Sequence, residues 1–203
     1  MESYSPKKLR IGVLALQGDF EAHIKMLEEL GVEGKAVRLP KHLENLDGII
    51  LPGGESTTIG KLMVLYGLDE PLQQKIREGL PIWGTCAGLI LLARETDNAL
   101  EGRPLLASMH IRVRRNAFGS QRESFETNLT VPAIGEAPFH AFFIRGPAVE
   151  SVGSEVEVLA TLDDGTIVAV REGHLLGTAF HPEIGGDPRF HQYFLRIVQS
   201  VKG

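Results

Sequence analysis

The first half of the chain alternates short apolar runs with segments of helical periodicity, and this pattern limits the fold most strongly. The apolar runs cover residues 11–16, 36–39, 48–51 and 81–84. The helical segments cover about 20–30, 56–65, 70–78 and 87–94. Continuous apolar strands that alternate with helices are typical of a parallel sheet covered on both faces. The sequence therefore predicts an α/β fold with a mostly parallel central sheet.

The second half has shorter strands and fewer helices. Alternating apolar and charged residues at 111–114 predict a strand with one solvated face. Further strands are expected at 124–129, 141–144, 156–162, 167–170 and 175–179. The turn Asp163-Asp164-Gly165 predicts a hairpin. A closing helix at about 188–201 places Phe190, Phe194, Ile197, Val198 and Val201 on one face. Residues 97–108 are the expected long loop.

Composition excludes several classes of function. The chain has 203 residues, a formal net charge of −5 and one cysteine. This length fits a single domain over 1–203. An acidic chain is not expected to bind nucleic acid or a membrane surface. One cysteine excludes an intrachain disulfide and any multi-cysteine metal site. The polar first ten residues predict no signal peptide, which points to the cytoplasm.

The segment Gly84-Thr85-Cys86-Ala87-Gly88 falls at a predicted strand-to-helix junction. A Gly-x-nucleophile-x-Gly pattern at such a junction is a nucleophile elbow, here with cysteine in place of serine. The helix N-terminus favours the Cys86 thiolate, and the amide of Ala87 can donate to an oxyanion. The alternative is a buried structural cysteine between two packing glycines.

A nucleophilic cysteine needs a base, and His181 is the strongest candidate among the seven histidines. It follows a predicted strand, and Glu183 lies two residues further on. In extended backbone these side chains point the same way, so Glu183 can fix the tautomer of His181. The alternative is a surface histidine beside a surface glutamate. The other histidines are expected on helix faces or in loops.

The loop after residue 51 contains Gly53 and Gly54, which let the backbone approach a ligand closely. The amide of Gly54 can complete an oxyanion hole with Ala87, and Ser56 or Thr57 can cap the next helix. The candidates for binding a charged amino acid are Glu55 for its ammonium and Arg115 and Arg145 for its carboxylate. Surface arginines without a ligand are the alternative.

These segments together resemble class I (triad) glutamine amidotransferases, and more closely the glutaminase subunits of pyridoxal 5′-phosphate synthase (the PdxT type). The resemblance is carried by segments spread over nearly the whole chain, at 14–18, 51–58, 84–89, 115–119, 124–126, 143–147 and 180–183. It implies a three-layer α/β/α sandwich. It also implies hydrolysis of L-glutamine to glutamate and ammonia through a cysteine thioester, with no cofactor and no metal.

The resemblance also implies a role for each matching residue. Cys86 is the implied nucleophile, His181 the base and Glu183 its orienting partner. The residues implied around the bound glutamine are Gly54, Glu55, Ser56, Arg115, Ile144 and Arg145. The implied partner is a PdxS-type synthase subunit in a hetero-oligomer, which receives the ammonia. Docking of that partner is expected to organise the Gly53-Gly54 loop, with contacts near Gln17-Gly18.

Three other interpretations remain open at this point. One is a glutaminase that serves another synthase, such as the imidazole glycerol phosphate type, in which the elbow and His-Pro-Glu segments look the same. A second is a cysteine hydrolase or chaperone of the DJ-1/PfpI superfamily, whose base need not lie in a His-Pro-Glu segment. A third is a binding module without enzymatic activity.

Overall fold

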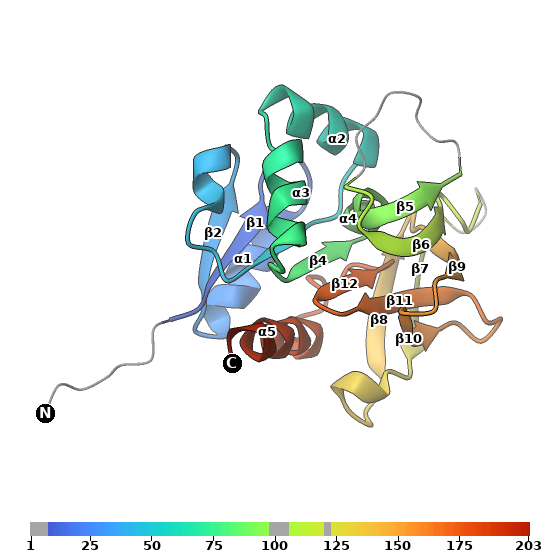
Figure 1. Ribbon diagram of the computed structural model, residues 1–203. Coiled ribbons are helices and arrows are strands. Elements are labelled where there is room, and N and C mark those ends of the chain that lie inside the picture. The colour runs from blue at the N-terminus through green and yellow to red at the C-terminus, as the bar shows by residue number, and fades with distance from the viewer. Residues whose placement is uncertain (1–7, 98–105, 120–122) are drawn as a thin grey trace, which may run out of the picture.

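The computed structural model describes residues 8–97, 106–119 and 123–203 (Figure 1). The strands are β1 (Arg10–Leu14), β2 (Glu33–Val37), β3 (Gly48–Leu51), β4 (Ile82–Thr85), β5 (Ala93–Thr96), β6 (Met109–Arg114), β7 (Ser124–Leu129), β8 (Phe139–Ile144), β9 (Ala148–Val152), β10 (Glu157–Thr161), β11 (Ile167–Glu172) and β12 (Leu175–Thr178). The helices are α1 (Phe20–Glu29), α2 (Ser56–Leu65), α3 (Asp69–Arg77), α4 (Ala87–Leu92) and α5 (Arg189–Lys202), and 3₁₀ turns cover Pro40–Leu43 and Pro132–Ile134. Within the described part of the chain, no helix is both long and apolar enough to cross a membrane.

The main sheet runs in the order β2-β1-β3-β4-β12-β11-β9-β6-β5, and β10 pairs with β11. The neighbouring strands β2, β1, β3, β4 and β12 are parallel to one another, as predicted for the first half of the chain. The later strands β11 and β9 pair with antiparallel neighbours, and β7 and β8 form a separate antiparallel pair. The parallel register sets Thr85 of β4 beside Thr178 of β12. The segments that follow these two strands therefore leave the sheet at the same edge.

Alternation along β4 shows how the helices form two layers. Trp83 points to one face, where its ring lies 5.7 Å from that of His23 on α1 and 5.7 Å from that of Phe194 on α5. Gly84 points to the other face, where a Cβ atom would lie 2.4 Å from the backbone of Gly88 on α4. Helix α2 packs against α4 on that face (Figure 1). The predicted three-layer α/β/α fold is confirmed.

Most predicted elements lie where the sequence placed them. The predicted hairpin joins β10 and β11, and Gly165 adopts the left-handed φ of 85° in its turn. The helix predicted over 87–94 is wrong at its end, because Ala93 begins strand β5, which pairs with β6. Strand β9 was not predicted. Val201, which the sequence placed on the apolar face of the closing helix, is 51% exposed. The predicted loop at 97–108 lies largely outside the described residues.

Candidate active site

Cys86 occupies the turn between β4 and α4, with a left-handed φ of 49°. Its amide donates to the carbonyl oxygen of Thr178 on the neighbouring strand at 2.8 Å. The two flanking glycines allow this turn, because larger residues would collide with backbone. A Cβ on Gly88 would lie 2.0 Å from the carbonyl oxygen of Leu51, and one on Gly84 would meet Gly88. Such a strained, closely packed turn is the geometry of a nucleophile elbow.

The thiol of Cys86 lies at the wall of a cavity of about 390 Å³. Its Sγ atom is 3.8 Å from the carbonyl oxygen of Ile144 on β8. Ala87 also lines the cavity, and its amide is the first of α4, where amides have no acceptor within the helix. Gly54 lines the cavity as well. The predicted oxyanion residues therefore border the same space as the thiol.

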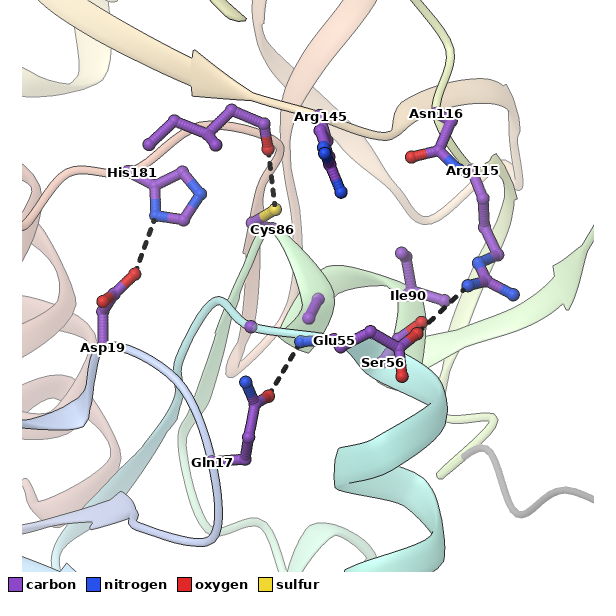
Figure 2. A pocket seen from close by; sticks show the side chains of 13 residues that line it. Gln17, Asp19, Glu55, Ser56, Cys86, Ile90, Arg115, Asn116, Arg145 and His181 are labelled. Carbon is purple, nitrogen blue, oxygen red and sulfur yellow. Dashed lines mark hydrogen bonds and ion pairs between the residues drawn. The ribbon is translucent and has the colours of Figure 1, made fainter. Parts of the chain in front are cut away.

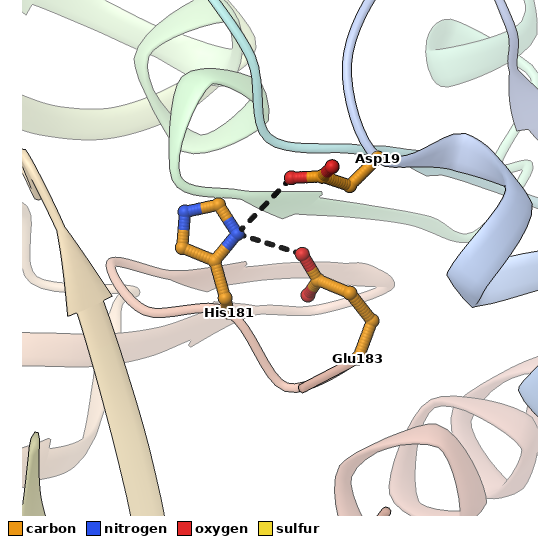
Figure 3. A group of neighbouring side chains, drawn as sticks. All are labelled: Asp19, His181 and Glu183. Carbon is orange, nitrogen blue, oxygen red and sulfur yellow. Dashed lines mark hydrogen bonds and ion pairs between the residues drawn. The ribbon is translucent and has the colours of Figure 1, made fainter. Parts of the chain in front are cut away.

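His181 reaches the cavity from the segment after β12 (Figure 2). Its amide donates to the carbonyl oxygen of Phe142 at 2.8 Å, which ties this segment to β8. Its Nδ1 donates to Oε1 of Glu183 at 2.7 Å, and Oδ2 of Asp19 lies 3.8 Å from the same nitrogen (Figure 3). The contact expected between His181 and Glu183 is confirmed. The backbone between these two residues is a turn and not extended as predicted. The amide of Ile184 closes this turn by donating to the carbonyl oxygen of His181.

The second ring nitrogen of His181, Nε2, points to the side of the cavity where Cys86 lies (Figure 2). Burial alone would lower the pKa of His181, but interactions with Cys86 and Glu183 outweigh burial and raise this pKa to about 10. An imidazole with such a pKa is protonated at neutral pH. The arrangement can therefore hold an imidazolium next to a thiolate, which is the reactive form of a cysteine.

The opposite wall of the cavity, away from His181, carries the predicted polar residues Glu55, Ser56 and Arg115, and Arg145 also lines the cavity (Figure 2). The Glu55 carboxylate accepts hydrogen bonds from the amides of Thr57 and Thr58, so Glu55 caps α2 and the prediction of Ser56 or Thr57 as the cap is wrong. Burial opposes ionisation of Glu55, but its bonds to Thr58 and Thr57 lower its pKa below the ordinary value.

Charges of both signs face this part of the cavity. A guanidinium nitrogen of Arg115 lies 3.5 Å from Oε1 of Glu55. Arg145, with a left-handed φ of 48°, extends from the end of β8 next to Ile144. An ionised carboxylate and two guanidinium groups match the two charges of an amino acid. All the residues that the resemblance implied around glutamine line this one cavity.

Sequence reasoning did not assign four of the residues that line the cavity to the substrate site. They are Gln17, Asp19, Ile90 and Asn116. Oε1 of Gln17 accepts from the amide of Glu55 at 2.8 Å and so links the end of β1 to the start of α2. Asp19 directly precedes α1, but its side chain makes no capping bond and lies beside His181. Position just after the carboxyl end of a parallel strand is the signal that could have identified both.

Three ligand-type side chains lie close enough together to suggest a metal site. In the part of the chain that the structure describes, ligand atoms of Asp19, His181 and Glu183 lie within 4.8 Å of one another. The nitrogen that His181 directs to this group already donates its proton to Glu183. This hydrogen bond suits an orienting contact between a base and a carboxylate.

Two further histidines lie behind Glu183, on helix faces as the sequence predicts. His23 of α1 and His191 of α5 are completely buried, and Nδ1 of His23 lies 2.9 Å from Nε2 of His191. Burial, together with His191 and His181, keeps the pKa of His23 well below its ordinary value. Burial lowers the pKa of His191 to about 3. Both rings are therefore neutral at physiological pH.

The buried histidines predict a loss of stability in acid. An unfolded histidine binds a proton near pH 6.5, whereas folded His191 does so only near pH 3. The stability that depends on neutral His191 is present above pH 6.5 and falls by about 1.4 kcal/mol per pH unit between these values. His181 does not offset this loss, because its raised pKa gives a contribution that is constant below pH 6.5 and is lost only toward pH 10.

Urea denaturation between pH 7 and 4 measures this loss. The His191→Phe variant is expected to show a pH slope that is shallower by about 1.4 kcal/mol per pH unit than that of the wild-type chain. Equal slopes for both proteins would contradict the assignment of His191 as a buried neutral group.

Comparison with known proteins agrees with this geometry. A family model described as the SNO glutamine amidotransferase family matches residues 13–200. A protein of Herpetosiphon aurantiacus named pyridoxal 5′-phosphate synthase subunit PdxT is 61% identical over 190 residues, which cover 93% of this chain and 100% of that protein. A crystal structure of a glutamine amidotransferase is 48% identical, with a TM-score of 0.87 over 93% of this chain and 98% of the other. The structure of PurLQS from Thermotoga maritima, with 18% identity and a TM-score of 0.69 over 93% of this chain and 98% of the other, shows likeness of fold alone. The chain belongs to the SNO glutamine amidotransferase family.

Proposed function

We propose that this chain is a glutaminase that hydrolyses L-glutamine to L-glutamate and ammonia. The observation that carries the proposal is one cavity that joins the elbow cysteine Cys86 and His181 on one side to Glu55 and Arg115 on the other. Membership of a glutamine amidotransferase family supports the same reaction. The cavity volume of about 390 Å³ falls in the range of small-molecule sites.

The residues divide the chemistry between them. The Cys86 thiolate attacks the side-chain carboxamide carbon, and the amides of Ala87 and Gly54 stabilise the oxyanion that forms. Protonated His181 gives its proton to the departing nitrogen, which leaves as ammonia. His181 then takes a proton from water, which hydrolyses the thioester and releases glutamate and the thiolate. Glu183 keeps the His181 ring oriented through Nδ1. Cys86, His181 and Glu183 thus form a catalytic triad.

The opposite wall selects the amino-acid end of the substrate. Arg115 and Arg145 attract the α-carboxylate, and the ionised Glu55 attracts the α-ammonium. Gly54, Ser56 and Ile144 border the side chain on its way to Cys86.

We propose that a synthase subunit consumes the ammonia that this chain releases. Relatives that share half or more of their residues with this chain are named pyridoxal 5′-phosphate synthase subunit PdxT. We therefore place the chain in the cytoplasm as the glutaminase of a hetero-oligomer with a PdxS-type synthase subunit. That partner consumes ammonia to make pyridoxal 5′-phosphate. Organisation of the Gly53-Gly54 loop by the partner stays a prediction.

Ammonia release from L-glutamine tests the function, measured with and without the purified PdxS-type subunit. We expect the partner to stimulate release strongly. Glutaminase activity that ignores this partner would point to a different synthase, such as the imidazole glycerol phosphate type. No release under either condition would contradict the glutaminase proposal and favour a binding module.

A further inference from the structure

A continuous row of buried side chains leads from His181 to the face of the sheet that α1 and α5 cover. The Nδ1 atom of His181 donates to Oε1 of Glu183 at 2.7 Å. The other oxygen of Glu183, Oε2, lies 3.4 Å from Nε2 of His23. Nδ1 of His23 in turn lies 2.9 Å from Nε2 of His191. The side chains of Glu183 and His23 are 1% and 0% exposed, so water does not compete for these contacts.

Protons can be arranged in this row in only one favourable way. Both rings are neutral, so each carries a single N–H. Nδ1 of His191 has no hydrogen-bond partner among the described residues, so a proton there would be a buried, unpaired donor. The proton of His191 therefore resides on Nε2 and is donated to Nδ1 of His23. His23 must then carry its own proton on Nε2, where it faces Glu183.

The reverse arrangement fails at two points. A proton on Nδ1 of His23 would be donated to Nε2 of His191 and would force the His191 proton onto the unpartnered Nδ1. It would also turn the lone pair of His23 Nε2 toward the carboxylate of Glu183, which is repulsive. The hydroxyl of Thr85, 3.5 Å from Nε2 of His23, can accept as readily as donate and so does not alter this choice.

The Glu183 carboxylate is stabilised by an N–H donor on His23. Its Oε2 makes no hydrogen bond within the described residues, and Nε2 of His23 is the ring nitrogen that faces it. A buried carboxylate with one unsatisfied oxygen is costly and tends to rotate or to bind a proton. Either change would weaken its hold on Nδ1 of His181. The distance of 3.4 Å is long for a hydrogen bond, but such bonds in sites without substrate commonly shorten during the reaction.

We propose that His23 is a positioning residue for the glutaminase reaction, with its Nε2–H directed at the free oxygen of Glu183 and its tautomer fixed by His191. N–H donors then reach the Glu183 carboxylate from both sides, with His23 directed at Oε2 and His181 at Oε1. His191 and His23 touch neither substrate nor thiol, and they act through Glu183 on the orientation of His181. This inference rests on the proposed glutaminase function.

Two variants of His23 test the proposal in the complex with the synthase subunit. His23→Leu removes the donor, and we expect kcat for ammonia release to fall by about 10- to 100-fold, the usual effect of losing an outer-shell partner. KM for glutamine is expected to stay within about 3-fold, because the substrate-binding wall is untouched. His23→Gln places an amide N–H near the same position, and we expect it to restore most of kcat.

Several outcomes would overturn the proposal. One is wild-type kcat in His23→Leu. Another is an equal loss of kcat in both variants, accompanied by equal losses of thermal stability, because that pattern indicates a packing role. An inactive wild-type complex would instead contradict the proposed function itself.

Nitrogen-15 NMR of the wild-type chain gives a reading that does not depend on variants folding. The proposal requires the Nε2–H tautomer of both His23 and His191 at neutral pH. Observation of the Nδ1–H tautomer at His23 would refute it.

Discussion

Replacement of Cys86 by alanine is expected to abolish ammonia release from glutamine, with a fall in kcat of about 10⁴-fold or more. The reason is that Cys86 is the group placed to form the thioester, and it is the one cysteine in the chain. The effect is measured in the presence of the PdxS-type partner, at saturating glutamine, with ammonia coupled to a spectroscopic assay.

The control for this experiment is the stability of the variant. The Cys86 side chain is small and lines the cavity. The urea concentration at the unfolding midpoint of Cys86→Ala is therefore expected to be close to that of the wild-type chain. A correctly folded Cys86→Ala protein that retains a tenth or more of the wild-type kcat would show that another group is the nucleophile.

Replacement of Gly88 by alanine is expected to destabilise the fold by about 3 kcal/mol or more, the upper end of the usual cost of overpacking. The added Cβ would lie 2.0 Å from the carbonyl oxygen of Leu51, which is backbone within the central sheet. Helix α4 would have to move away from β3, and the turn that holds Cys86 would move with it. Urea denaturation measures the destabilisation, and ammonia release is expected to fall with it.

Gly67→Ala provides the matched control. Gly67 follows α2 with a left-handed φ of 66°, and a Cβ there would meet nothing within 4 Å. Its replacement costs only the backbone strain of that conformation, about 1 kcal/mol. If Gly88→Ala is no more destabilising than Gly67→Ala, then the close contact between α4 and β3 does not constrain the elbow.

The parallel half of the fold could be predicted because local signals agree with the tertiary structure there. Strand β3 and helix α2 have the bounds that the sequence predicts. The apolar run of each strand is continuous since both faces of the sheet are covered. The role of Gly84 and Gly88 could also be predicted, because the requirement for small residues two positions before and after Cys86 is local.

Features that depend on packing between distant segments could not be predicted in this way. Residues 93–96 contain no glycine or proline, so the end of α4 is set by pairing of β5 with β6 and not by a local stop signal. Glu55 caps α2, and its own amide donates to Gln17 on a distant segment, a contact that no local pattern signals. The burial of His191 follows from the way in which α5 packs on Trp83.

Labelling of Cys86 by a glutamine-analogue electrophile, such as a diazoketone, tests the central claim most directly. With one cysteine in the chain, intact-mass spectrometry identifies a single adduct without ambiguity. We predict one adduct on Cys86 in the complex with the PdxS-type partner, slowed by L-glutamine and not by L-asparagine. Labelling that L-glutamine does not slow, or an adduct located elsewhere in the chain, would contradict the claim that this cavity holds glutamine with its carboxamide at Cys86.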